Sequence, residues 1–323
     1  MGMTKPNVLP SGVWETLLPH AFKLIDEVKN HGGVSNPFFT FGGGTVLMLR
    51  HNHRMSKDID FFVPNPQYLG YVTPRLSEVA EELCGGHYKE ASNYVKLQLD
   101  AGEIDVVASP NLLPDEIAFE TWDLFGQAVR VETAAEIVAK KMYHRGNEGT
   151  PRDLFDLAMV IEQEPDALKP AAPFMYRHLD AFSDALAAPP QAMRERFESI
   201  DTLQYNPTFE HAIGVTLGYF DNLKAIRLRS AEEASAYIGA SNMTLASVDT
   251  NKGEYCGPIL HHTGRHVVQG IGRGEAVVHD LTAFGPTTSQ QPHVGSDVMR
   301  VRYRDGGASV SVAQQQTAAR GSR

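Results

Sequence analysis

The chain has 323 residues, and its 42% hydrophobic and 21% charged residues are typical of a soluble globular protein long enough for two domains. Its formal net charge of −10 disfavours a protein held to nucleic acid mainly by phosphate neutralisation, but a nucleic acid substrate in one local basic cleft stays possible. No apolar run reaches the roughly 18 residues that cross a bilayer, a signal-peptide layout is absent, and two cysteines are too few for a disulfide framework or zinc site.

These features predict a cytoplasmic protein with reduced thiols and no membrane partner.

The charge is unevenly placed along the chain. Residues 231–323 hold eight Lys or Arg and eight Asp or Glu, so the whole excess of acid lies in residues 1–230.

Apolar spacing and turn residues predict alternating helices and strands in the first half of the chain. Expected helices are 13–29, with Pro19 as a kink or break, the run after Thr45, and 75–84. Expected strands are 38–41, 58–63 and 127–131, with a hairpin joining 94–99 to 104–108.

Helical signals then dominate up to about residue 229. Thr133 and Glu136 form a capping-box pattern before one helix, and Pro151 suits the first turn of the next. Prolines interrupt the helical character of residues 166–229, and short β-like runs rich in Gly, Val and His follow over 253–311.

This pattern predicts an α+β fold with a domain boundary between residues 230 and 250. We expect an α+β core with a mixed sheet over 1–165 and a helical subdomain of the same unit over 166–230. A small all-β domain over 250–312 and a disordered polar tail over 313–323 complete the prediction.

Two carboxylates stand at the start of the expected strand Asp-Ile-Asp-Phe-Phe-Val, residues 58–63. Because residues i and i+2 of a strand point to one face, Asp58 and Asp60 project together while Ile59 turns into apolar packing. Close carboxylates repel and are costly to bury unpaired. A divalent cation such as Mg²⁺ relieves that cost and keeps coordination sites for phosphate oxygens.

A run of three glycines precedes this strand and leads into a helix. Such a turn presents backbone N–H groups and the positive helix end to an anion, usually phosphate. Gly43 and Gly44 therefore form a candidate phosphate cradle, to which the Thr45 hydroxyl adds one more donor.

A third carboxylate, Asp105, lies on the later hairpin between two apolar neighbours. Three carboxylates can hold two metal ions about 3.5–4 Å apart, the arrangement for in-line attack on phosphorus. Asp58, Asp60 and Asp105 are therefore the candidate ligands for Mg²⁺ or Mn²⁺.

These motifs together resemble the nucleotidyltransferase superfold of polymerase-β type. The stretch EIVAKKMYHRGNEGTPRDLFDLAMV narrows the resemblance to the AbiEii/AbiGii family, the toxin halves of type IV toxin–antitoxin and abortive-infection systems. In that family a lysine-bearing helix precedes Arg-Asp-X-X-Asp, and here Lys141, Arg152, Asp153 and Asp156 fill those positions. Members often carry Ser after the glycines, whereas this chain has a third glycine and then Thr45.

The resemblance implies a set of site residues. It implies catalytic roles for Asp58, Asp60, Asp105 and Lys141, and nucleotide binding by Gly43, Gly44, Thr45, Arg152, Asp153 and Asp156. Simpler interpretations stay open: Asp105 as an ordinary hairpin acid, Lys140 in place of Lys141, and Asp153 and Asp156 as caps or salt-bridge partners. For Arg50, His51, His53 and Arg54 we favour the side chains of a loop over a phosphate-binding wall.

The C-terminal stretch GEYCGPILHHTGRHVVQGIGRGEAVVHD resembles the small KfrB-type domain of conjugative plasmid proteins. Eleven residues match its pattern: Gly253, Tyr255, Gly257, Ile259, Val268, Gln269, Gly272, Arg273, Gly274, His279 and Asp280. The histidine spacings fit no standard zinc pattern, and we interpret the Val/His alternation as half-exposed sheet. The resemblance implies a β-barrel accessory module and a mobile-element setting.

The function that these features predict is metal-dependent transfer of a nucleotide from a nucleoside triphosphate, with release of pyrophosphate. The resemblance implies an RNA acceptor, tRNA in particular, and a cognate antitoxin as partner. Two alternatives remain: transfer to a small molecule or a protein side chain, and a non-enzymatic plasmid maintenance protein whose N-terminal domain is a relic.

Overall fold

The computed structural model describes residues 6, 8–285, 291–295 and 297–313. The chain divides into two compact units, Met1–Tyr219 and Phe220–Arg323. Helix α11 (Phe209–Ala240) contributes to both, so the second unit begins inside a helix and before the boundary expected between residues 230 and 250. The predicted disordered tail lies, beyond Ala313, outside the described residues.

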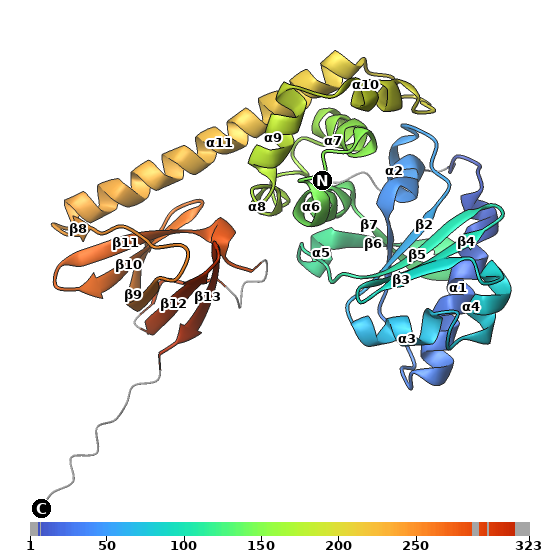
Figure 1. Cartoon of the computed structure of the whole chain (residues 1–323), viewed down its shortest axis with the longest axis horizontal. Helices are drawn as coiled ribbons and strands as arrows, with labels where there is room; N and C mark the ends of the chain where they lie inside the picture. The colour runs from blue at the N-terminus through green and yellow to red at the C-terminus, as the bar shows by residue number, and fades with distance from the viewer. Residues whose placement is uncertain (1–5, 7, 286–290, 296, 314–323) are drawn as a thin grey trace, which may run out of the picture. The chain divides into compact units, whose positions relative to one another are not determined.

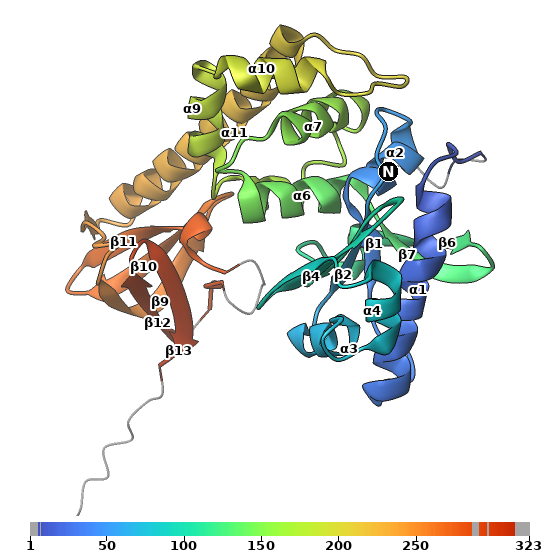
Figure 2. The ribbon, with the colours of Figure 1, turned by 45° about the vertical axis from the view of Figure 1, so that its right-hand side comes forward.

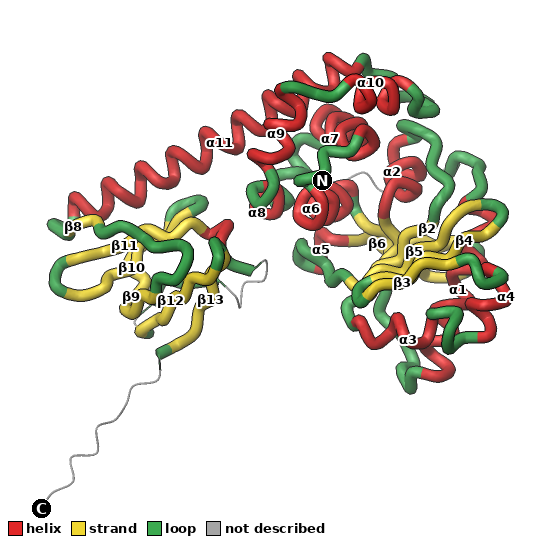
Figure 3. The backbone as a smooth tube through the Cα atoms, viewed as in Figure 1, coloured by secondary structure: helices red, strands yellow, loops and turns green. Residues whose placement is uncertain are grey.

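One seven-stranded mixed sheet, whose strands are yellow in Figure 3, forms the centre of the first unit. Its strand order is β3-β4-β5-β2-β1-β7-β6. The pairs β2/β5 and β1/β7 are parallel and the other pairs antiparallel. The strands are β1 (Thr40–Gly42), β2 (Ile59–Val63), β3 (Tyr88–Ala91), β4 (Tyr94–Leu99), β5 (Gly102–Ala108), β6 (Phe119–Leu124) and β7 (Gln127–Glu132). The predicted hairpin is confirmed, whereas β3 and β6 were not predicted.

Helices cover both faces of this sheet, as Figures 1 and 2 show from two directions. On one face lie α1 (Trp14–His31), α3 (Leu69–Val72) and α4 (Glu78–Cys84); on the other lie α2 (Gly43–His51), α6 (Ala134–Arg145) and α7 (Pro151–Gln163). Helix α1 runs unbroken through Pro19, so the expected break is wrong; eight buried side chains hold it. Shorter helices are α5 (Asp115–Ala118), α8 (Ala172–Met175), α9 (Leu179–Ala187), α10 (Gln191–Glu198) and the 3₁₀ turn η1 (Pro66–Tyr68).

Strand β2 shows the alternation that its sequence predicts. Ile59, Phe61 and Val63 are fully buried, and the Phe61 ring lies 6.1 Å from that of Phe22 on α1. Phe62 faces the other way, toward α6, where the Lys140 ammonium lies 4.2 Å from its ring centre. The single polar side chain of β2, Asp60, is thereby directed toward α2 and α6.

Two caps fix the start of the helices that face this polar side. The Thr133 hydroxyl accepts a hydrogen bond from the Glu136 N–H, which is half of the predicted capping box. The Glu136 carboxylate instead accepts from the N–H groups of Leu112 and Leu113, and so anchors the loop after β5. Thr150 caps α7, whose first residue is Pro151 as expected.

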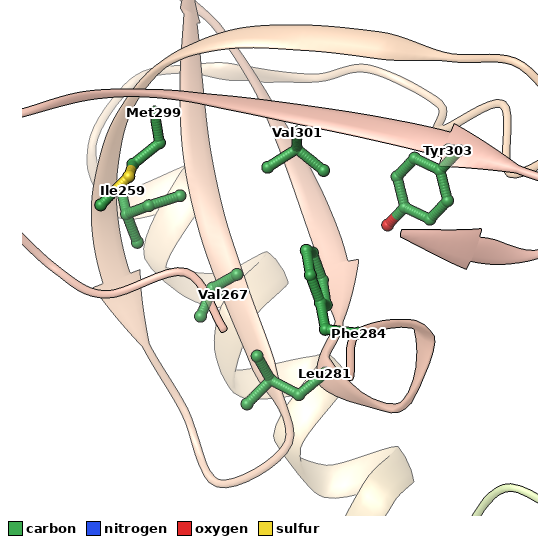
Figure 4. Close-up of a cluster of buried hydrophobic side chains, with 7 residues drawn as sticks. All are labelled: Ile259, Val267, Leu281, Phe284, Met299, Val301 and Tyr303. Carbon is green, nitrogen blue, oxygen red and sulfur yellow. The ribbon is translucent and has the colours of Figure 1, made fainter. Parts of the chain in front are cut away.

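The second unit contains a six-stranded sheet in the order β13-β12-β9-β10-β11-β8. Its strands are β8 (Thr244–Leu245), β9 (Glu254–His262), β10 (His266–Gly272), β11 (Glu275–Asp280), β12 (Val298–Arg304) and β13 (Gly307–Val312), with the 3₁₀ turn η2 (Leu281–Ala283). A core of seven side chains, drawn in Figure 4, fills one side. A smaller core joins Ala234 and Ile238 of α11 to Val268 and Ala276.

His266 and His279 are buried and so differ from the half-exposed sheet residues that were expected, whereas His261 is partly exposed and His262 is exposed. His279 is fully buried: its Nδ1 lies 3.0 Å from the Tyr303 hydroxyl and its Nε2 lies 2.8 Å from Gln269 Oε1. Gln269 in turn donates to the carbonyls of Gly257 and Met299. Burial lowers the pKa of His279 to about 4, so its ring is neutral and serves as a core hydrogen-bonding group.

Candidate active site

A pocket of about 300 Å³ opens between the polar side of the first sheet, the start of α2, and α6. It contains five of the ten predicted site residues: Gly43, Gly44, Asp60, Asp105 and Lys141. Its other lining residues are Phe62, Asn93, Val107, Ala108, Ser109, Glu132, Ile137, Lys140, His144 and Arg145. We call this the catalytic pocket below.

Asp60 and Asp105 are direct neighbours on the parallel strands β2 and β5. Burial, and then the nearby charge of Asp105, raise the pKa of Asp60 to about 7. Asp105 Oδ2 lies 2.9 Å from the Lys96 ammonium, whereas its buried Oδ1 has no hydrogen-bond partner among the described residues. The two carboxylates therefore form an under-compensated pair of negative charges.

The glycine turn lies against this pair. Gly43 has φ +71°, a conformation that L side chains rarely adopt, and a Cβ there would lie 2.0 Å from Asp60 Oδ2. Only glycine therefore fits beside this carboxylate. Helix α2 begins at Gly43, so the free N–H groups of its first turn and its positive end lie at the catalytic pocket.

Thr45 and Asp58 have different surroundings from those the sequence suggested. Thr45 is fully buried, and its hydroxyl donates to the Asp58 carbonyl at 2.5 Å. It thus ties α2 to the start of β2 and is not among the lining residues of the catalytic pocket. The Asp58 carboxylate accepts a hydrogen bond from the Glu103 N–H at 3.2 Å and lines a neighbouring recess.

Lys141 is held by the two acids of the Arg-Asp-Leu-Phe-Asp motif. Its ammonium lies 2.6 Å from Asp153 Oδ1 and 2.7 Å from Asp156 Oδ2. Arg145 forms two hydrogen bonds to Asp153, and its charge and that of Lys141 hold the pKa of Asp153 at about 2 despite burial. Asp153 and Asp156 are buried behind the pocket wall, where they position the two cations that reach it.

Asp156 also gathers two basic residues from the segment after α2. Its carboxylate accepts two hydrogen bonds from the Arg54 guanidinium, at 2.6 and 2.8 Å, and lies 2.9 Å from His53 Nε2. His53 and Arg54 are buried, as is Arg50, which donates to the carbonyls of Val131 and Glu132. The expectation that these residues are the side chains of an exposed loop is therefore wrong, because each has a buried acceptor.

Among the pocket residues that were not predicted, three are charged: Glu132, Lys140 and Arg145. Lys140, weighed only as a rival of Lys141, is buried with its ammonium 2.6 Å from Glu132 Oε1. Glu132 ends β7 and also accepts from the Thr40 hydroxyl. Arg145 lies four residues after Lys141 on α6, a spacing that places both on one helix face and could have identified it.

The residues present fit a divalent cation in part. No group of three or more His, Cys, Asp or Glu in the described ranges is arranged to hold a metal ion. Asp60 and Asp105 nevertheless offer two adjacent carboxylates and one unpartnered buried oxygen. Mg²⁺ in phosphate-transferring sites is commonly bound by one or two carboxylates plus substrate phosphates, so this pair suffices for that mode.

A mixed sheet with paired carboxylates on adjacent strands, beside a glycine turn that starts a helix, defines a nucleotidyltransferase site. Comparison with known families agrees: residues 33–223 match the family described as nucleotidyl transferase AbiEii toxin, type IV TA system. The match covers more than half of the chain, which therefore belongs to this family of nucleotidyltransferases. Residues 254–312 match the KfrB domain, so the expected fusion of the two is confirmed.

No curated protein matches the chain. Across the described part of the chain, none of the helices combines the length and apolar character that a membrane span requires.

Proposed function

We propose that this protein transfers a nucleoside monophosphate from a nucleoside triphosphate to the end of an RNA, with tRNA as the leading acceptor. The observation that carries this proposal is the pairing of Asp60 and Asp105 beside the glycine turn. Family membership supports a triphosphate substrate and an antitoxin partner. Both a triphosphate and tRNA occur in the cytoplasm, where we expect the reaction.

The triphosphate is bound in our assignment by groups from two elements. The N–H groups at the start of α2, at Gly43 and Gly44, donate hydrogen bonds to the phosphate oxygens. Lys141 and Arg145 add two cations from α6 on the opposite wall. Because Asp153 bonds both cations, they are oriented before the substrate arrives.

A divalent cation held by Asp60 and Asp105, Mg²⁺ or Mn²⁺, would supply charge neutralisation at the reacting phosphates. We retain Asp58 as an expected third ligand, because its charge contributes to the raised pKa values of both Asp60 and Asp105. The bond between Asp58 and the Glu103 N–H uses only one of its carboxylate oxygens.

The chemical step is an in-line displacement. The acceptor hydroxyl oxygen forms a bond to the α-phosphorus, and the bond from this phosphorus to the oxygen bridging the α- and β-phosphates breaks. Pyrophosphate leaves with that oxygen and its electron pair. The proton of the hydroxyl passes to Asp105, whose Oδ1 has no other hydrogen-bond partner among the described residues.

Transfer onto purified tRNA with each of the four labelled triphosphates tests the proposal. We expect label on tRNA that depends on added Mg²⁺ or Mn²⁺ and is absent with Asp60→Ala and Asp105→Ala. Total cell extract serves as a second acceptor mixture. Label on protein or on small molecules, with none on RNA, would contradict the RNA acceptor and favour transfer to a protein side chain or a small molecule.

A further inference from the structure

A second recess, of about 360 Å³, lies next to the catalytic pocket and carries exposed cations. Three segments form it: the chain between α2 and β2, the first turn of α7, and the end of α10 with the residues that follow. Its lining residues are Arg54, Met55, Ser56, Lys57, Asp58, Arg152, Arg196, Ser199, Ile200 and Asp201. We call it the basic recess.

The walls of the basic recess are fixed by backbone hydrogen bonds. The Met55 N–H donates to the Asp201 carbonyl at 2.8 Å, and Arg54 forms a β-bridge with Thr202. The Leu203 N–H donates to the His53 carbonyl at 3.0 Å. The loop after α2 is thereby held against the chain after α10, so the recess exists before any ligand binds.

The charge of the basic recess contrasts with the rest of its unit. Lys57, Arg152 and Arg196 are exposed, and none of them forms an ion pair within the described ranges. Arg54 is already neutralised by Asp156, while the acids that line the recess are Asp58 and Asp201. Three available cations thus gather at one place in a region that holds the whole acid excess of the chain.

The basic recess adjoins the phosphate-binding turn directly. Gly44 lines the catalytic pocket, and a Cβ there would lie 2.8 Å from Arg54 Nη2 and 3.1 Å from Ser56 Oγ, which both line the recess. Asp58 of the recess precedes Asp60 of the pocket by two residues. An anion in the recess would therefore lie beside the reacting centre and on the other side of the glycine turn.

We propose that the basic recess binds backbone phosphate groups of the acceptor RNA strand through Lys57, Arg152 and Arg196. This inference rests on the proposed function. The triphosphate already has two cations and a helix N-terminus in the catalytic pocket, so the three cations across the turn remain for a different phosphate. Arg152, which the sequence suggested for nucleotide binding, is reassigned to the acceptor.

The test is a triple variant, Lys57→Gln, Arg152→Gln and Arg196→Gln, assayed for transfer with tRNA and triphosphate varied separately. The three phosphate contacts that it loses should raise KM for tRNA about 10-fold or more and leave KM for the triphosphate within about twofold. Its tRNA affinity should also depend less on salt, with a log–log slope smaller by about 2, because each lost contact with a single strand removes about 0.7.

The control is a second triple variant, Lys23→Gln, Lys29→Gln and Lys89→Gln, at three exposed lysines of the same unit. It removes the same amount of charge, but at positions outside the recess. It should behave as the parent protein. Should the triple variant fold poorly by circular dichroism, the single variant Arg196→Gln on the surface of α10 replaces it, with an expected increase of about threefold in KM for tRNA.

Two results would overturn the inference: a raised KM for the triphosphate with an unchanged KM for tRNA, or no difference between the triple variant and its control. Equilibrium binding of tRNA to Asp60→Ala protein, with and without the three recess substitutions, tests the basic recess independently of the proposed transfer reaction. Binding that weakens there supports the recess even if no nucleotide is transferred, whereas equal binding refutes the recess alone.

Discussion

Asp60 is the residue at which function and stability oppose each other most directly. Burial and the neighbouring Asp105 raise its pKa from 3.8 to about 7 in the folded protein. The folded state therefore binds a proton that the unfolded state has already released between these values. The contribution of Asp60 to the free energy of unfolding consequently falls as the pH rises from about 4 to about 7. This contribution is lowest when Asp60 is ionised and no cation is bound beside it.

Replacement of Asp60 by Asn should therefore stabilise the metal-free protein while abolishing transfer. At pH 8 we expect the free energy of unfolding to rise by about 1–3 kcal/mol, below the limit of about 4 kcal/mol that three pKa units would give. At pH 4 the gain should disappear. Urea unfolding in EDTA at both pH values measures this, with exposed Asp26→Asn on α1 as the control. Destabilisation by Asp60→Asn at pH 8 would contradict the repulsion inferred here.

Asp156 shows the opposite behaviour, since its charge is needed. The carboxylate is fully buried, and the charges of Arg54 and Lys141 hold its pKa well below the usual range despite burial. A carboxyl with a depressed pKa contributes stability above its unfolded pKa, and this contribution is lost as the pH falls toward the folded value. Asp156 thus stabilises the protein throughout the neutral range.

We predict that Asp156→Asn lowers the free energy of unfolding at pH 7 by about 3–5 kcal/mol, because the buried charge of Arg54 would lose its carboxylate partner and Lys141 would keep only Asp153. The matched control is Asp166→Asn, which removes an exposed ion pair with Lys169 and should have no measurable effect. Denaturant midpoints of both variants provide the comparison. Equal effects at the two positions would show that the buried ion pairs of Asp156 stabilise the fold no more than an exposed ion pair does.

Helix α6 illustrates how one element distributes its cations at the scale of secondary structure. Lys140 turns to Glu132 at the end of β7, whereas Lys141 and Arg145 turn to Asp153 at the start of α7. Adjacent residues of a helix do not share a face, so the two lysines reach different walls of one pocket. The sequence left open which of the two lysines belongs to the site. In the structure both line the pocket, and each contacts a different acid.

The turn before α2 is the element most sensitive to substitution. We predict that Gly43→Ala lowers transfer about 100-fold, because a positive φ and a close approach to Asp60 together displace the carboxylate by a fraction of an ångström or more. The control, Gly214→Ala in α11, meets no atom within 4 Å and should stabilise the protein by about 0.5–1 kcal/mol. Single-turnover rates and unfolding curves test both. Near-parental transfer by Gly43→Ala would show that the tight turn is dispensable.

At the scale of the whole molecule, two separate cores predict two unfolding transitions. The second unit has its own buried cluster and a neutral buried His279, and the first has its own sheet and charge network. In calorimetry at pH 7, Asp156→Asn should lower the midpoint of one transition and His279→Ala that of the other. A single transition shifted by both variants would contradict independent cores.

His279 also gives its transition a pH dependence with a defined sign. Its pKa is about 4 when folded and 6.5 in the unfolded reference, so the unfolded state takes up a proton first as the pH falls. The stability of the second unit should decrease between about pH 6.5 and 4, and His279→Ala should remove part of this decrease.

The sequence by itself determined the two families, the alternating strand with its acids, the hairpin that carries Asp105, the Thr133 cap of α6 and the start of α7 at Pro151. These features depend on local periodicity, turn residues and capping chemistry, which neighbouring residues specify. It did not determine that His53 and Arg54 are buried, because that required Asp156, about a hundred residues later.

The tertiary structure alone decided which charges meet. It paired Asp60 with Asp105 through parallel strands, turned Thr45 inward, and gathered Lys57 and Arg196 in one recess, where neither forms an ion pair within the described ranges. Electrostatic interactions depend on distance in space and on burial, and residues far apart in the chain acquire both only when the sheet and helices assemble.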